Sequence, residues 1–365
     1  MGLQCGIVGL PNVGKSTLFN ALSNAGAQSA NFPFCTIEPN IGVVQVPDER
    51  LMQLAKLINP QKIMQTTVEI VDIAGLVKGA SKGEGLGNQF LGNIRSTDAI
   101  VHVVRCFEDD NIVHVDGSVD PVRDKEVIDI ELQLKDLESV EKQIDKLHKQ
   151  SKGGDKAALH GVDVLKTVKA HLESGQSART ADVEEDDWHF VKEMDLLTTK
   201  PILYVCNVDE NSAKEGNKFS AALMEAVKDE PAEVIIISAG IESEIAQLDT
   251  IEERQEFLQE LGLDKGGVER MIQSCYKLLN LITYLTAGEK EVRAWTVKEG
   301  STAPQAAGVI HTDFEKGFIR AEVIKYSDFI SLGSEAACRE AGKMAVEGKE
   351  YIVKDGDIMH FRFNV

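Results

Sequence analysis

Hydrophobic and polar positions alternate along this chain in two patterns, and each pattern predicts one kind of element. Short continuous apolar runs are typical of buried strands, and apolar residues spaced three or four positions apart are typical of helices. Both patterns recur through the N-terminal and middle parts of the chain, which favours an α/β fold. The predicted strands are residues 3–8, 41–46, 67–71, 99–105, 201–206 and 234–237, and the predicted helices are 15–22, 48–57, 251–261 and 268–279.

A different pattern fills residues 121–200. Apolar residues recur at helical spacing over 128–147 and 157–172, and a glycine-containing break at 151–154 separates the two stretches. An acidic run then precedes a third helical stretch at 188–197. We expect an antiparallel, coiled-coil-like helical insertion. Whether it is a passive solvated hairpin or a docking arm stays open at this point.

Alternating short strands mark the C-terminal part of the chain. Their order of hairpin, helix and further strands predicts a ubiquitin-like α+β module. The strands are 281–286, 292–295, 319–324 and 358–363, with a helix at 302–311. The expected domains are a nucleotide-binding domain in two parts, the helical insertion and the C-terminal module, at residues 1–120 with 201–280, 121–200 and 281–365.

The strongest chemical signal is Gly9-Leu10-Pro11-Asn12-Val13-Gly14-Lys15-Ser16, which fits the phosphate-loop pattern G-x-x-x-x-G-K-[ST]. A strand precedes it and a helix follows, so an ordinary tight turn explains it poorly. The backbone N–H groups and the helix N-terminus would cradle phosphates. Lys15 would reach the β- and γ-phosphates, and the Ser16 hydroxyl would ligate Mg²⁺. The predicted phosphate-binding residues are Asn12, Val13, Gly14, Lys15, Ser16 and Thr17.

Two further segments predict nucleotide-dependent switches. The loop at 27–39, which contains two prolines, offers Thr36 as a second Mg²⁺ ligand. The alternative is a threonine that merely caps. Asp72-Ile73-Ala74-Gly75 ends a strand as D-x-x-G, where Asp72 would hold Mg²⁺ through water and the Gly75 N–H would contact the γ-phosphate. Cys35 allows redox regulation as a further hypothesis, although an inert small residue is the simpler interpretation.

Leu76 follows Gly75, where many GTPases carry a glutamine that orients the attacking water. Leucine cannot hydrogen-bond to water, so another group is needed. His114 is our candidate, and the alternative is a surface histidine in a short extended segment. The predicted catalytic residues are therefore Lys15, Gly75 and His114.

The base-recognition segment is Asn207-Val208-Asp209-Glu210, where GTPases carry N-K-x-D. The aspartate of that motif accepts hydrogen bonds from N1–H and the 2-amino group of guanine. Adenine lacks the 2-amino group and its N1 is an acceptor, so Val208 and Glu210 point away from strict guanine selection. Asn207, the backbone near Val208 and a Ser238-Ala239-Gly240 turn would contact the base. A degenerate guanine site is the alternative.

Composition narrows the partners. The chain has 365 residues and a formal net charge of −20, which argues against broad electrostatic wrapping of nucleic acid. No DNA specificity is expected, while a local basic surface for RNA stays open. The six scattered cysteines predict reduced thiols in a cytoplasmic protein without a zinc site. No apolar run predicts a membrane span, and no signal peptide is expected.

The chain resembles the YchF/Obg-like ATPase family of P-loop NTPases over essentially its whole length. The resemblance rests on GLPNVGKST, FCTIEPN, DIAGLVKGAS, the departure at Asn207–Glu210 and the C-terminal AWTVKEGSTAPQAAGVIHTDFEKGFIRAEV. It implies a Ras-like P-loop core interrupted by a helical arm and followed by a TGS domain. It also implies a preference for ATP over GTP and an association with ribosomes and RNA. In some related NTPases the position of Asn12 coordinates K⁺.

The expected function is that of a slow Mg²⁺-dependent ATPase that acts as a ribosome-associated switch in translation or stress response. We expect a cytoplasmic monomer with no membrane partner. The alternative is a GTP-binding module that docks RNA or protein and in which hydrolysis is incidental.

Overall fold

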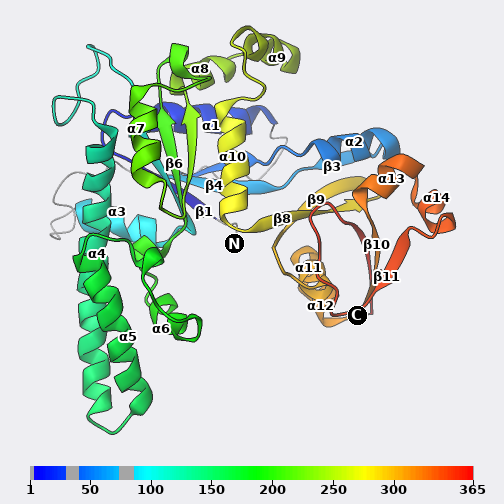
Figure 1. Ribbon diagram of the computed structural model, residues 1–365. Helices are drawn as coiled ribbons and strands as arrows, with labels where there is room; N and C mark the ends of the chain where they lie inside the picture. Colours follow the sequence, from blue (N-terminus) through cyan, green and yellow to red (C-terminus); the bar gives the residue numbers. More distant parts are fainter. Residues whose placement is uncertain (1–3, 30–40, 74–85, 365) are drawn as a thin grey trace. The chain divides into compact units, whose positions relative to one another are not determined.

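The computed structural model describes residues 4–29, 41–73 and 86–364 (Figure 1). Thr36 and Gly75, with Cys35 and Leu76, lie outside these ranges. The chain divides into two compact units, Met1–Val44 with Glu69–Met271 and Gln45–Val68 with Ile272–Val365. Each unit has its own six-stranded sheet.

The sheet of the first unit has the strand order β2-β4-β1-β5-β6-β7. Strands β4, β1, β5, β6 and β7 run parallel to one another, so their C-terminal ends meet at one edge. In an open α/β sheet, ligands bind at that edge. The strands are β1 (Gln4–Val8), β2 (Ile41–Gln45), β4 (Thr67–Asp72), β5 (Ala99–Arg105), β6 (Ile202–Asn207) and β7 (Glu233–Ile237).

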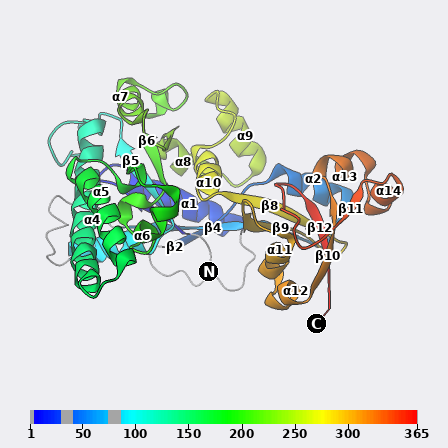
Figure 2. The ribbon, with the colours of Figure 1, turned by 60° about the horizontal axis from the view of Figure 1, so that its bottom comes forward.

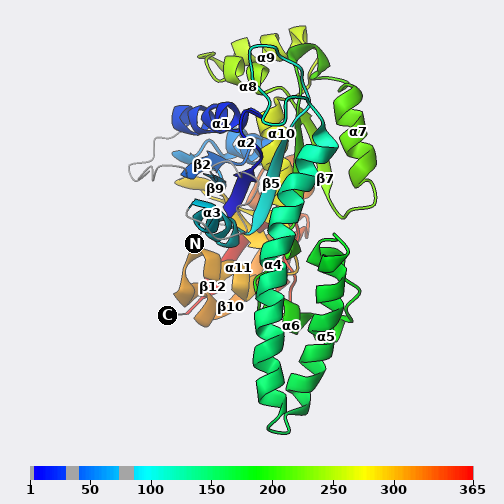
Figure 3. The same ribbon diagram turned by 90° about the vertical axis from the view of Figure 1, so that its left-hand side faces the viewer.

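Helices cover both faces of this sheet, and α1 and α7 lie on opposite sides of it (Figure 3). Strand β5 is buried at every position, as its apolar run predicts. Helices α3, α7 and α8 had not been predicted. The helices are α1 (Lys15–Ser29), α3 (Leu86–Arg95), α7 (Lys218–Val227), α8 (Ala239–Ile245), α9 (Ile251–Glu260) and α10 (Gly267–Leu278).

The helical insertion is an antiparallel pair, α4 (Pro121–Ser151) and α5 (Lys156–Glu173), which extends away from the sheet (Figures 1 and 3). We call this pair the arm. Asp120 and Asp155 cap the two helices by accepting backbone N–H bonds. Apolar residues at helical spacing form its core. Within the described ranges, no helix is both long and apolar enough to cross a membrane.

The third helix of the insertion is shorter than the sequence pattern predicted. Helix α6 covers only Trp188–Lys192, and the expected continuation to residue 197 is wrong. The chain turns at Asp195, which has a left-handed backbone with φ 46°. Asp136 then accepts the N–H groups of Leu197 and Thr198 at 2.8 and 2.7 Å and fixes the turn that follows.

The second unit has a mixed sheet of order β11-β10-β12-β8-β9-β3 with helices on both faces (Figure 2). Adjacent residues of one strand serve the two faces: Tyr284 packs in the cluster of α11, and Leu285 packs in the cluster of α13. The elements are β8 (Leu281–Ala287), β9 (Glu291–Lys298), α11 (Ala303–Ile310), α12 (Thr312–Lys316), β10 (Phe318–Ile324), α13 (Tyr326–Leu332), α14 (Glu335–Glu340), β11 (Met344–Glu347) and β12 (Ile358–Phe363).

An early segment of the chain belongs to this second unit, although the expected division placed it in the nucleotide-binding domain. Strand β3 (Lys62–Met64) pairs with β9, and α2 (Glu49–Ile58) packs in the cluster that contains Leu285. Leu51 and Leu54 of α2 are fully buried there. Arg50 adds an ion pair to Asp355 at 2.6 Å.

Replacing Leu54 by alanine should destabilise the second unit by about 2–5 kcal/mol, because it leaves a cavity between α2 and the sheet. Leu57→Ala on the same helix is the control, since Leu57 is 45% exposed. In a Trp188→Phe background, the fluorescence of Trp295 reports urea unfolding of this unit. Equal losses for the two leucines would contradict the assignment of α2 to this core.

Candidate functional site

The phosphate-loop segment joins β1 to α1 through backbone conformations that glycine adopts most readily. Gly9 and Gly14 have φ of 155° and 94°, and Asn12 has φ of 62°. A Cβ on Gly14 would lie 2.2 Å from the side-chain nitrogen of Asn207. A side chain therefore cannot be accommodated at Gly14 without displacing Asn207.

Asn207 is the brace between the two loops of the site. Its Nδ2 donates to the carbonyl of Val13 at 2.8 Å, and its Oδ1 accepts the N–H of Ala239 at 2.9 Å. The residue is 5% exposed. The nitrogen and the oxygen of the side chain thus each bond to the protein, which gives Asn207 a supporting role. The base contact expected from the sequence stays a prediction.

Lys15 and Asp72 form the charged centre of the site. Lys15 is 8% exposed, and its Nζ donates to the Leu10 carbonyl at 3.1 Å. Burial lowers the pKa of Lys15, an effect that the Asp72 carboxylate opposes. Burial likewise raises the pKa of Asp72, which the Lys15 charge lowers in part.

The Asp72 carboxylate fits a role beside a cation. Its Oδ1 is buried and has no hydrogen-bond partner among the described residues. An unpaired buried carboxylate oxygen is costly unless a ligand completes it. Ser16 stands exposed at the start of α1, so its hydroxyl is open to a ligand. These residues therefore suit Mg²⁺, which prefers oxygen ligands.

One cavity of about 650 Å³ connects the phosphate loop with the segments after β6 and β7. This volume is within the range of about 300–1,000 Å³ that is usual for small-molecule sites. Of the residues that sequence reasoning selected, the cavity is lined by Asn12, Gly14, Thr17, Asn207, Val208, Glu210, Ser238, Ala239 and Gly240. Phe107, Glu108, Asp109, Ile112, Asp209 and Asn211 complete the lining.

The segment after β6 presents an uncharged residue and a carboxylate to this cavity. Val208 is 3% exposed, and its N–H donates to the Ile237 carbonyl at 2.9 Å. Glu210 lies beside the next turn, because a Cβ on Gly240 would be 3.4 Å from its Oε1. Ser238 caps α8 by accepting the Ile241 N–H.

Arg105 organises the loop after β5, a role that sequence reasoning missed. The residue is 2% exposed, and its guanidinium donates to the carbonyls of Phe107, Asp109 and Ile112 at 3.1, 3.3 and 3.0 Å. The available signal was a cation at the end of a strand that is apolar except for His102. A buried guanidinium is expected to be hydrogen-bonded, and here its acceptors are backbone carbonyls although Glu108 and Asp109 follow closely in sequence.

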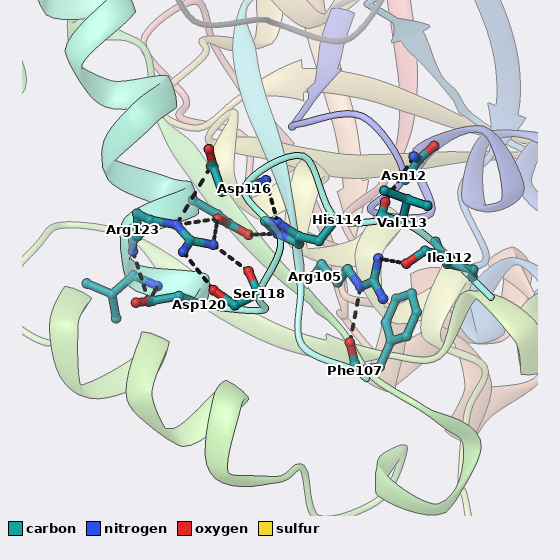
Figure 4. A network of polar contacts seen from close by, with 12 residues as sticks. Asn12, Arg105, Phe107, Ile112, Val113, His114, Asp116, Ser118, Asp120 and Arg123 are labelled. Atoms are coloured by element: carbon teal, nitrogen blue, oxygen red, sulfur yellow. Dashed lines mark hydrogen bonds and ion pairs between the residues drawn. The ribbon is translucent and has the colours of Figure 1, made fainter. Parts of the chain in front are cut away.

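His114 is held against the arm and does not line the cavity. Its Nε2 lies 2.7 Å from Asp124 Oδ2, and its Nδ1 accepts the Asp116 N–H at 3.1 Å. The preceding residue, Val113, instead accepts a bond from Asn12 at 3.1 Å. Figure 4 shows Val113 beside Asn12, whereas the His114 ring lies toward Arg123. In this structure the ring bonds to the arm, and the water-orienting role expected from the sequence stays a prediction.

Comparison with known protein families gives a match for the N-terminal part of the chain and another for the C-terminal part. Residues 4–148 match a family model described as 50S ribosome-binding GTPase. Residues 281–364 match the model YchF-GTPase_C, described as a protein of unknown function (DUF933). The chain is 57% identical to the ribosome-binding ATPase YchF of Haemophilus influenzae and covers 100% of both chains. The chain belongs to the YchF family.

Other YchF proteins match over essentially their whole length. The ribosome-binding ATPase YchF of Bacillus subtilis is 56% identical over 367 residues, again with 100% coverage of both. The solved structure of the Schizosaccharomyces pombe YchF GTPase is 40% identical, with a TM-score of 0.90 over 99% of this chain and 98% of that one. The YchF fold therefore includes the helical arm and the C-terminal unit as well as the P-loop core.

Asp72→Asn should make the ligand-free protein more stable near pH 7, because burial raises the pKa of Asp72 and so disfavours its charged form. The difference in the free energy of unfolding should vanish as the pH falls, because the wild-type carboxyl is then protonated in both the folded and the unfolded state. Urea unfolding between about pH 4 and 8 measures it, with exposed Asp145→Asn as the control. A variant that is less stable at neutral pH would refute the expected direction.

Proposed function

We propose that this protein is a Mg²⁺-dependent ATPase that binds the ribosome. The observation that carries the nucleotide choice is the pair Val208 and Glu210 in the cavity wall. The relatives named above are called ribosome-binding ATPases, whereas the S. pombe structure is titled a GTPase. The chemistry of the cavity must therefore decide between the two nucleotides.

Guanine selection depends on an acceptor for two guanine donors, N1–H and the 2-amino group. Adenine has no donor at these positions, so a fixed aspartate there would face the N1 lone pair without a bond. In this cavity Glu210 is one methylene longer and exposed beside Gly240. Val208 supplies no cationic stem to cover the base. The adenine amine would donate to a backbone carbonyl near Val208. The cavity wall would hold no fixed aspartate opposite the lone pair of adenine N1.

Phosphoryl transfer requires positioning and charge neutralisation more than covalent chemistry from the protein. Lys15 would exchange its bond to the Leu10 carbonyl for the β- and γ-phosphates. Ser16, Thr36 and Asp72 would hold Mg²⁺, Asp72 through water. When bound, Mg²⁺ would neutralise the phosphate charge. The Gly75 N–H would contact the γ-phosphate.

Water orientation requires a group other than Leu76. We propose His114 for this role, after movement from its position against α4. Asn12 is proposed as a ligand for an activating K⁺, in addition to the bond that it donates to Val113. Both groups would act on the side of the site formed by residues 107–114. His114 would supply the hydrogen bond to water, and K⁺ held by Asn12 would supply a positive charge.

The ribosome is the proposed partner, with RNA contact as part of that binding. This would place the protein in the cytoplasm, and we propose that it acts as a monomer. The arm and the C-terminal α+β module, which we propose to be a TGS domain, are the candidate contacts. A docking module with incidental GTP hydrolysis is the competing function.

Calorimetric titration with ATP and GTP in Mg²⁺ tests the proposal most simply. We expect ATP to bind more tightly than GTP. The double variant Val208→Lys with Glu210→Asp recreates N-K-x-D and should shift the ratio toward GTP by about tenfold or more, since a restored bidentate acceptor discriminates strongly. Glu225→Asp, an exposed change on α7, is the control.

Tighter binding of GTP by the wild type would refute the ATPase proposal and favour the docking module. Binding of neither nucleotide would refute both. Co-sedimentation with ribosomes in the presence and absence of ATP then separates the partner from the chemistry. Failure to sediment under both conditions would refute ribosome binding alone.

A further inference from the structure

The loop formed by residues 107–116 connects the phosphate loop to the arm. At one end of this connection Val113 accepts a bond from Asn12 of the phosphate loop. At the other end His114 bonds to Asp124, which lies in the first turn of α4. Figure 4 shows Val113 beside Asn12 at one end of this stretch and His114 on the side of Arg123 at the other. All the residues involved belong to the first unit.

The two hydrogen bonds of His114 determine which ring nitrogen carries the proton. Because Nδ1 accepts the Asp116 N–H, the proton is on Nε2 and is donated to Asp124. The His114 side chain is 6% exposed and that of Asp124 is 3% exposed. Neither nitrogen is therefore available to a water molecule in the cavity.

Asp124 is itself held in place on its other side. Its Oδ1 accepts from Arg123 at 3.0 Å, and Arg123 also donates to the Ser118 carbonyl at 2.5 Å. Hydrogen bonds to a charged acceptor are stronger than neutral ones. The carboxylate therefore restrains the ring more firmly than the neutral amide of an asparagine would.

We propose that Asp124 is a positioning residue that latches His114 onto the arm and that release of this latch limits hydrolysis. This inference rests on the proposed role of His114 in orienting water. Since Asp124 belongs to α4, displacement of the first turn of the arm releases the ring. The pair His114–Asp124 and the bond between Val113 and Asn12 together link the arm to the phosphate loop.

Asp124→Asn tests the latch because it keeps the shape of the side chain and removes its charge. The Asp116 amide, which donates to His114, is an internal reporter, and hydrogen exchange over residues 107–120 should accelerate in the variant. The kcat for ATP should rise about tenfold with KM unchanged, since the lost restraint is a charge-assisted bond. Asp124→Glu should restore slow exchange and the low kcat.

The matched control is Asp129→Asn on the same helix, whose carboxylate pairs with Lys125 at 2.7 Å and not with His114. It should change neither the exchange of residues 107–120 nor kcat. In the double variant, His114→Ala should abolish the gain that Asp124→Asn produces. That result separates release of the ring from general loosening of the helix.

The possible failures are distinguishable. Unchanged exchange in Asp124→Asn, or a kcat that stays the same or falls, would overturn the latch. Full turnover in His114→Ala would instead refute the proposed role of His114, and with it the inference. Failure of every form to bind ATP would refute the proposed function before the latch enters.

Discussion

The geometry of the candidate site depends on the two hydrogen bonds of Asn207. One joins the end of β6 to the phosphate loop, and the other joins it to the turn that begins α8. These segments are far apart in sequence and meet because their strands are parallel and end at one edge. The buried amide of Asn207 is hydrogen-bonded through its nitrogen and through its oxygen, and these bonds offset the cost of burying it. The two loops are therefore held at a fixed separation. The wall that contains Val208 and Glu210 is thereby set relative to the phosphate-binding backbone.

This frame holds the charged centre formed by Lys15 and Asp72. Lys15 and Asp72 are partly or fully buried, and burial shifts both pKa values against the charged forms. An unliganded pair of this kind reduces stability, yet it is preorganised for a phosphate and a cation. Only the well-packed strands around it, such as the fully buried β5, make such a centre tolerable. The packing of the core, and not the site itself, supplies the stability that offsets the cost of this charged pair.

The sequence predicted most strands and the long helices, because their periodicity is strong and local. It could not predict which core α2 joins: the apolar face with Leu51 and Leu54 is visible in the pattern, but its partners are residues near 285 and 329. The phosphate-loop and base-side residues were found because their motifs fix residue types. A motif gives the residue and not the direction of its bonds, so the supporting role of Asn207 could not be predicted from it.

The contacts of His114 and Arg105 illustrate a second limit of sequence reasoning. Arg105 ends a mostly apolar strand and His114 lies in the loop that follows, so both are visible in the sequence. Their spacing does not predict which groups the guanidinium and the ring bond to. Arg105 bonds to the backbone of its own loop, and His114 bonds to a carboxylate of the arm. Tertiary structure alone decides that the histidine faces the arm in this state of the protein.

The most direct test of the central claim is the ATP affinity of Asn207→Ala, measured by calorimetry together with its free energy of unfolding. The exposed residue Asn93 of α3 provides the control variant Asn93→Ala. If Asn207 sets the spacing of the two loops, the affinity falls by about tenfold or more while the protein remains folded. An unchanged affinity in a folded Asn207→Ala protein would contradict the account.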